Sequence, residues 1–494
     1  MFQDTERCVR AVLSNDSRFD GQFITAVVTT GIYCRPSCPV APPKPENMRF
    51  LPTAAAAHAA GFRACKRCRP DAAPGSPEWD TRSDLVARAL RLIGDGVIDR
   101  EGLDGLADRL GYSRRQLQRQ MAAVLGAGPL AIARAQRAQA ARILLETTTM
   151  PMADVAFAAG FGSVRQFNDT MREVFALPPS ALRSKAKAAA PATPGTVTVR
   201  LSFRPPLWPH SLFGHLVATA VPGVEEWRDG AYRRTMRLPH GNGIVALSPH
   251  PDHITCQLTL DDMRDFATAI ARCRRLLDLD ADPAAVDAAL AKDRTLRPLV
   301  KASPGRRIPR TVDEHELALR VVLGQQVSTA AARTHAARLV VDCGEPVNDP
   351  RHTLTHLFPT ADALAGIDPA ALALPGARRR TFVLLAQALA DGKVDLSVGG
   401  DRAEARERLA EIPGVGPWTT SVIAMRALGD PDAFLAEDLG VRAAASALGL
   451  PTSAAALSAH AQRWRPWRAY AVQYLWGVGD HPINRLPLEP DPGR

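Results

Sequence analysis

The stretch LAEIPGVGPWTTSVIAMRAL, residues Leu409–Leu428, decides the fold of the C-terminal half of the chain. Pro413, Gly414 and Gly416 separate two runs of helical periodicity, so the stretch predicts a helix-hairpin-helix. Glycines let a phosphate approach the main-chain N–H groups at the start of the second helix, where the helix dipole also favours an anion. The hairpin is compatible with an ordinary turn, and as a functional element it predicts backbone binding to nucleic acid.

Three further segments surround this hairpin in the sequence. They are DAFLAEDLGVR at Asp432–Arg442, VVLGQQVS at Val321–Ser328 and RWRPWRAYAVQYLWG at Arg463–Gly477. With the hairpin, they resemble the helix-hairpin-helix glycosylase superfamily, and above all the AlkA type of 3-methyladenine DNA glycosylase. The resemblance begins at about Val197 and runs to the end of the last segment.

The resemblance implies that Asp438 is the catalytic carboxylate, with Glu437 beside it a surface or capping acid. A preplaced carboxylate suits the chemistry, because cleavage of an N-glycosidic bond builds oxocarbenium character on the sugar. Trp476 matches the tryptophan that lines the family's base pocket, and Trp418 lies close to the hairpin. An alkylated, cationic base flipped from the duplex would stack on such rings, although either tryptophan is also compatible with core packing.

The same resemblance bears on the reaction class and on the DNA contacts. Trp418 stands where lyase-type relatives carry a lysine, so hydrolysis is expected rather than Schiff-base strand cleavage. Gln326 occupies the position of the family's apolar wedge, where a polar side chain would have to fill the vacated stack. Gly414 and Gly416 are expected to bind the DNA backbone, and a monovalent cation is a further expectation at the hairpin.

Four of the eight cysteines form two close pairs near the N-terminus. Cys34 and Cys38 have three residues between them, and Cys65 and Cys68 have two, a spacing that suits tetrahedral Zn²⁺ with four thiolates. A purely structural zinc site is the plainer interpretation. A disulfide pair is disfavoured by the cytoplasmic setting expected from the charged start and from the lack of a long apolar run.

The residues around the cysteines, TTGIYCRPSCPV at Thr29–Val40 and GFRACKRCRPD at Gly61–Asp71, closely resemble the N-terminal domain of the Ada adaptive-response protein. That resemblance implies that Cys34 irreversibly takes a methyl group from a methylphosphotriester in DNA, with Cys38, Cys65 and Cys68 as the remaining zinc ligands. Methylation removes one negative charge. We therefore expect the methylated protein to bind DNA more tightly, which turns damage into a transcriptional signal.

Between the two halves, a helical region repeats one pattern. Ala107, Gly111, Ser113 and Leu117 recur as Ala156, Gly160, Ser163 and Phe167, which predicts two helix-turn-helix units, and the second resembles the AraC family. Phe157, Phe161, Phe167 and Phe175 are expected in the core. Side chains that read bases or phosphates, or that merely solvate the helices, are expected at Arg114, Arg115, Gln118, Arg119, Arg165, Gln166 and Asn168.

The predicted organisation is therefore a multidomain α+β protein. Apolar residues make up 46% of the 494 positions, and a net charge of +10 favours a polyanionic partner. Strands are expected at Val197–Phe203, Gly243–Leu247 and His253–Leu260, followed by a helix at Met263–Leu277. The expected units are an Ada-like zinc domain (1–76), an all-α double helix-turn-helix (80–184), a linker (185–196), an AlkA-like N-terminal α+β domain (197–305) and an all-α helix-hairpin-helix glycosylase domain (306–494).

The leading hypothesis is a fusion of an Ada-like sensor with an AlkA-like glycosylase. The first half would repair methylphosphotriesters and activate transcription, and the second would excise alkylated purines. One alternative is a transcription regulator whose glycosylase half only grips DNA, and another is a glycosylase whose zinc half is a structural clamp. The expected partners are damaged and promoter DNA and RNA polymerase, with no membrane, in the cytoplasm.

Overall fold

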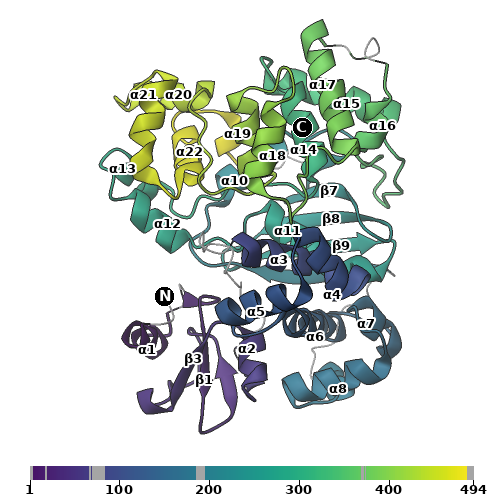
Figure 1. The fold of residues 1–494 in the computed structure, drawn as a ribbon, viewed down its shortest axis with the longest axis vertical. Coiled ribbons are helices and arrows are strands. Elements are labelled where there is room, and N and C mark those ends of the chain that lie inside the picture. Colours follow the sequence, from purple (N-terminus) through teal and green to yellow (C-terminus); the bar gives the residue numbers. More distant parts are fainter. Residues whose placement is uncertain are drawn as a thin grey trace, which may run out of the picture.

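The computed structural model describes residues 4–16, 19–65, 68, 70, 84–184, 195–368, 372 and 374–486. In it, a five-stranded sheet lies between the N-terminal units and the C-terminal helices (Figure 1). Residues 71–83 and 185–194, the latter most of the predicted linker, lie outside the described residues. Among the described helices, none is long and apolar enough to cross a membrane.

The cysteine-rich unit is built on a small sheet with the strand order β3-β1-β2-β4. Strand β2 pairs antiparallel with β1 and parallel with β4, which brings the segments that follow β2 and β4 together. The elements of this unit are α1 (Thr5–Leu13), β1 (Ile24–Val27), β2 (Ile32–Cys34), η2 (Pro45–Asn47), β3 (Met48–Leu51), α2 (Ala54–Ala59) and β4 (Arg63–Ala64).

Two helix-turn-helix units follow, as the repeat predicts. In the first, Gly111 makes the turn at φ 73°, and Ser113 caps the next helix in a capping box with Gln116. In the second, Gly160 has φ 84° and Ser163 is the cap. The helices are α3 (Asp84–Gly94), α4 (Val97–Leu110), α5 (Arg114–Leu125), α6 (Pro129–Thr147), α7 (Met152–Ala158), α8 (Val164–Phe175) and α9 (Pro179–Ser184).

The aromatic core of the second unit differs from expectation at one position. Phe161, Phe167 and Phe175 are buried as predicted. The prediction that Phe157 lies in the core is wrong, because 49% of its surface is exposed. Its neighbours Val155 and Ala158 supply the buried face of α7, so the phenyl ring between them faces outward.

The central sheet is antiparallel, with the order β5-β9-β8-β7-β6. The expected strands and helix are present, whereas β6 and β7 were not predicted. A buried apolar cluster continues from the cysteine-rich unit through the helix-turn-helix helices into this sheet. The elements are β5 (Thr196–Ser202), α10 (Pro209–Ala218), β6 (Glu225–Arg228), β7 (Ala231–Arg237), β8 (Asn242–Pro249), β9 (His253–Leu260), η5 (Met263–Asp265) and α11 (Phe266–Leu276).

The rest of the described chain is almost entirely helical and packs around a second large core. Its hairpin consists of α18 (Arg402–Ala410) and α19 (Pro417–Arg426). The other elements are α12 (Pro283–Leu290), α13 (Leu296–Ala302), α14 (Glu314–Leu323), α15 (Thr329–Cys343), α16 (Ala361–Ala365), α17 (Gly376–Ala390), α20 (Leu439–Ala447), α21 (Ala454–His460), η7 (Ala461–Trp464), α22 (Arg468–Trp476) and η8 (Pro482–Asn484).

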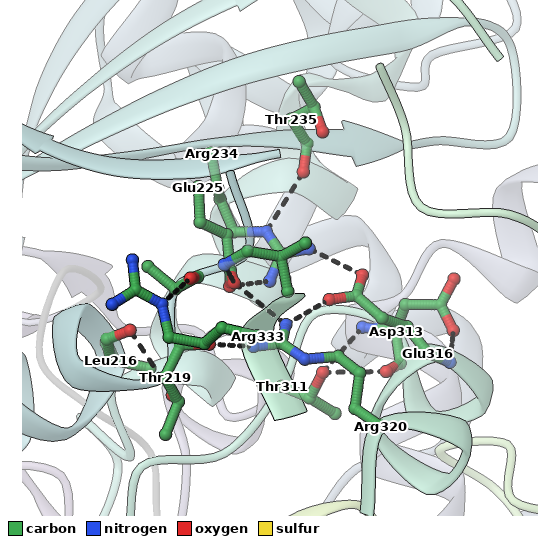
Figure 2. Close-up of polar contacts among 12 residues, drawn as sticks. Leu216, Thr219, Glu225, Arg234, Thr235, Thr311, Asp313, Glu316, Arg320 and Arg333 are labelled. Carbon is green, nitrogen blue, oxygen red and sulfur yellow. Dashed lines mark hydrogen bonds and ion pairs between the residues drawn. The ribbon is translucent and has the colours of Figure 1, made fainter. Parts of the chain in front are cut away.

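A ring of buried charges fixes α14 to the sheet (Figure 2). Arg234 donates to Glu316 at 2.7 Å and to Glu225 at 3.1 Å. Arg320 in turn lies 2.6 Å from Glu316 and 2.9 Å from Glu225. Although burial acts to raise it, the pKa of Glu225 lies below its usual value because of Arg320 and Arg234. Each charge is therefore paired, which is the condition for burying it.

The N-terminal units dock on the C-terminal half through a polar seam centred on Asp95. This residue, 7% exposed, accepts from Arg272 Nε at 3.2 Å and lies 3.8 Å from Arg275. Alongside it, Arg88 and Arg91 each donate at 2.6 Å to main-chain carbonyls of the loop before α18. The two halves are thus held together by buried contacts as well as by the chain.

Substitution of Asp95 tests this seam. Asp95→Ala leaves Arg272 largely buried without its carboxylate, so the free energy of unfolding should fall by about 3 kcal/mol in urea titrations of the full chain. The control is Asp252→Ala, because Asp252 makes an exposed pair with Arg200. That variant should keep the wild-type midpoint, and equal midpoints for all three proteins would contradict a stabilising seam.

Candidate functional site

Asp438 is held by three hydrogen bonds that come from three helices. Its Oδ1 accepts from the main-chain N–H of Val441, where Asp438 caps α20, and from Trp476 Nε1, both at 2.9 Å. Its Oδ2 accepts from Trp418 Nε1 at 2.9 Å. With donors on both oxygens, the carboxylate is held in one orientation.

Both tryptophans named from the sequence therefore meet at the predicted carboxylate. Trp418 lies on α19 directly after the hairpin turn, and Trp476 ends α22. Each is half-buried, packs against the large core and points its indole N–H at Asp438. Each ring packs against the core while its N–H donates to the carboxylate, so core packing alone does not describe either tryptophan.

The residues on either side of Asp438 in the chain are exposed. Glu437 is exposed and Leu439 is 80% exposed, whereas Asp438 itself is half-buried. A Cβ at Gly440 would lie 3.2 Å from Asp438 Oδ1 and 3.3 Å from Trp476 Cδ1. Glycine at this position allows the indole to come close to the carboxylate.

The hairpin turn has the open main chain that its glycines predicted. Gly414 has φ 87°, and a Cβ there would lie 2.0 Å from Thr381 Oγ1, so only glycine fits. A Cβ at Gly416 would meet nothing within 4 Å, and no side chain caps α19, which begins at Pro417. The first N–H groups of α19 therefore lack a side-chain cap, which is the arrangement that favours an anion at a helix start.

A loop between α14 and α15 approaches this turn. Gln326 is exposed and has a φ of 54°, an uncommon conformation for a residue other than glycine and one that often marks functional sites. Gln325 beside it donates to Gly414 O at 3.1 Å and to Thr419 Oγ1 at 2.9 Å. Sequence reasoning missed Gln325; its place in GQQV, next to the predicted wedge, was the only signal.

The four predicted cysteines form a second site at the edge of the small sheet. Cys34 ends β2 and Cys65 follows β4, and the parallel pairing of these strands brings the two cysteine pairs together. All four ligand atoms lie within 4.8 Å of one another. Cys38 and Cys68 are buried, whereas Cys34 and Cys65 are half-exposed.

Four sulfur atoms this close together fit a divalent cation. A hydrogen bond from Cys34 lowers the pKa of the Cys68 thiol to about 6, and burial raises that of Cys38 to about 11. Hydrogen bonding to Cys68 and burial raise the pKa of Cys34 well above its usual value. The sulfurs alone share protons and cannot all ionise, whereas four-thiolate coordination of Zn²⁺ stabilises the ionised form of each.

The loop that joins the first two cysteines is tied to the rest of the molecule through Asp20. Ser37 donates to the carboxylate of Asp20 with its N–H at 3.0 Å and its hydroxyl at 2.5 Å. Arg204, which precedes α10 and is 1% exposed, donates to Asp20 O at 2.7 Å. No motif indicates this link, because Asp20 and Arg204 are far apart in the chain.

The residues named on the two recognition helices lie on or near the surface. In α5, Arg114 pairs with Asp104, while Arg115, Gln118 and Arg119 are exposed. In α8, the side chain of Arg165 is 93% exposed and Asn168 is half-buried. Gln166 is also exposed, but its side chain accepts from Gly162 N at 3.2 Å and so helps to cap the helix.

Three family models match separate parts of the chain. They are the metal-binding domain of Ada at residues 7–71, a helix-turn-helix domain at 106–185 and the AlkA N-terminal domain at 198–313.

Three curated relatives match over longer stretches. A Mycobacterium tuberculosis protein named "Probable bifunctional transcriptional activator/DNA repair enzyme AlkA" is 62% identical over 490 residues, 99% of each chain. DNA-3-methyladenine glycosylase 2 of Escherichia coli is 33% identical over 56% of this chain and 95% of its own length. The E. coli "Bifunctional transcriptional activator/DNA repair enzyme Ada" is 36% identical over 33% of this chain and 45% of its own.

Metal analysis tests the four-thiolate centre. The full chain should contain one zinc ion per molecule by elemental analysis, and Cys38→Ala should lose most of it because three thiolates bind less tightly than four. Cys343→Ala is the control, since Cys343 is a half-exposed thiol at the end of α15, outside the cluster. Unchanged zinc in Cys38→Ala would contradict the ligand set.

Proposed function

The chain belongs to the family of bifunctional transcriptional activator/DNA repair enzymes that join an Ada-like half to an AlkA-like glycosylase, and we propose that Cys34 and Asp438 carry its two repair reactions. It binds DNA, repairs alkylation damage and activates transcription. The single observation that carries the glycosylase assignment is the convergence of Trp418, Trp476 and the N-terminus of α20 on Asp438.

In the glycosylase half, Asp438 stabilises the positive charge that develops on the sugar as the bond to the base breaks. The departing purine takes the bonding electrons, and water then adds to the sugar carbon and releases a proton to the solvent. The two indole N–H groups fix the carboxylate before the substrate arrives. An alkylated base is already cationic, so little protonation is needed for it to leave, and its charge favours stacking on an aromatic face such as Trp476.

Access to the base requires that the nucleotide leave the duplex. We assign the DNA backbone to the turn at Gly414 and Gly416, where the start of α19 offers unpaired N–H groups. A monovalent cation at this turn is part of the proposal. Gln326 is assigned to the gap left in the stack, since it is exposed at the tip of the neighbouring loop. Its amide fills space and offers hydrogen bonds.

In the N-terminal half, the Cys34 sulfur attacks the methyl carbon of a methylphosphotriester. A carbon–sulfur bond forms, the carbon–oxygen bond breaks, and the electron pair stays on the phosphate oxygen as an ordinary phosphodiester anion. Bound zinc keeps the sulfur ionised at neutral pH. Cys34 is half-exposed, unlike Cys38 and Cys68, which suits it to meet a substrate.

Methylation also changes the charge of the N-terminal half. A thiolate becomes a neutral thioether, so one negative charge disappears from a surface that meets phosphates. We propose that promoter binding strengthens as a result, with Arg115, Arg119 and Arg165 among the contacts of the two recognition helices. An activator of this kind acts on RNA polymerase, and its thiolates require a reducing compartment such as the cytoplasm.

The alternative, a regulator whose C-terminal half only binds DNA, gives Asp438 no task beyond capping α20. A DNA clamp requires the hairpin and basic side chains but not a carboxylate, which repels phosphates. The three donors on Asp438 therefore favour an enzyme.

Base release from methylated duplex DNA tests the active site. Asp438→Asn should slow release by at least about 100-fold, because the amide keeps the size of the side chain but not its charge. The matched control is Glu437→Gln, one residue earlier and exposed, which should release bases at the wild-type rate. Equal rates for Asp438→Asn and wild type would refute the assignment.

Mapping of the methylated residue tests the other half. After incubation with methylphosphotriester DNA, mass spectrometry of peptides should find one methyl group, on Cys34, in both wild type and Cys343→Ala. The Cys34→Ala variant should accept no methyl group from the DNA. A methyl group found on Cys38, Cys65 or Cys68 of the wild type would show that the acceptor has been misassigned.

A further inference from the structure

One residue beside the glycosylase centre comes from outside the helical domain. His215 lies on α10, and its ring stacks on Trp476 with centroids 5.7 Å apart and an interplanar angle of 25°. Trp476 is the ring whose Nε1 donates to Asp438 at 2.9 Å. His215 is thus one contact away from the carboxylate.

The surroundings of His215 explain how α10 comes so close to Trp476. A Cβ at Gly214 would lie 2.4 Å from the carbonyl oxygen of Arg485 and 2.8 Å from that of Ile483, so glycine lets the segment after α22 pack directly on α10. In that segment, Asn484 donates to Trp476 O at 2.7 Å. The main chain of Trp476 is therefore fixed from one side and its ring is covered from another.

The protonation state of His215 follows from its burial and its neighbours. The residue is 8% exposed, and its Nε2 has no hydrogen-bond partner among the described residues. Buried polar atoms are normally paired, and an unpaired one costs stability. The ring also carries no charge, because burial and the positive charges of Arg426, Arg320 and His481 hold the pKa of His215 well below its usual value.

We propose that His215 is a positioning residue of the glycosylase: its stacked ring holds the Trp476 indole in the plane from which Nε1–H reaches Asp438. This inference rests on the proposed role of Asp438. The chemistry assigns His215 no proton transfer and no contact with the base. A neutral ring behind Trp476 adds no positive charge that would oppose a cationic base on the indole.

Single variants test the need for a ring. In release of alkylated purines from methylated duplex DNA, His215→Ala should lower kcat about tenfold, the effect of loosening one hydrogen bond to a charged group. Affinity for undamaged duplex should not change. His215→Phe should restore most of the rate, whereas His215→Gln, polar but without a ring, should behave as His215→Ala. A wild-type rate for His215→Ala or His215→Gln, or a slow His215→Phe, would overturn the proposal.

A double-mutant cycle separates positioning from general destabilisation. Trp476→Phe keeps a ring but lacks the N–H, so adding His215→Ala to it should cost less than about twofold in kcat. Additive losses would show that His215 does not act through the Trp476 hydrogen bond and would overturn the inference. Asp438→Asn is assayed in parallel: if that variant keeps full activity, the proposed active site itself fails, whatever the His215 variants do.

Discussion

The glycosylase half is organised by the need to hold one carboxylate immobile where three helices meet. Asp438 meets this constraint with donors from α19, α20 and α22, so three helices must converge to within hydrogen-bond distance of two oxygen atoms. Because Trp418 directly follows the hairpin turn, the segment proposed to grip the DNA backbone and the proposed reaction centre form one rigid unit. The ring of buried charges fixes α14, and the loop after α14 approaches the hairpin turn of this unit.

Much of the site could be predicted from the sequence because its signals are local. The cysteine spacing, the Gly-Ser turns of the helix-turn-helix units and the glycines of the hairpin each set the backbone within a few residues. Asp438 and both tryptophans were named from motifs, and the structure brings all three together. The motifs did not predict how the two tryptophans contact Asp438. Both rings were expected to line a base pocket, and the hydrogen bonds from their indole N–H groups to the carboxylate were not predicted.

The features that escaped prediction depend on partners far away in the chain. Strand β7 contains Arg233 and Arg234, and a run of charges does not suggest a buried strand until Glu225, Glu316 and Asp349 are placed around it. His215 was missed for the same reason. A lone histidine on an apolar helix indicates no function until its stacking on Trp476 is known. The prediction for Phe157 failed because an aromatic residue is expected in the core unless the packed face of its helix is known.

Because of the seam at Asp95, one mutation can affect both halves of the protein. The loop before α18 presents Gly399 to Leu92 of the helix-turn-helix region, and a Cβ at Gly399 would lie 2.6 Å from that leucine side chain. A single codon change at such a position, which touches neither Cys34 nor Asp438, disturbs the docking of both halves. Alleles of this kind are pleiotropic, so natural selection on either repair reaction also constrains the residues that support the other.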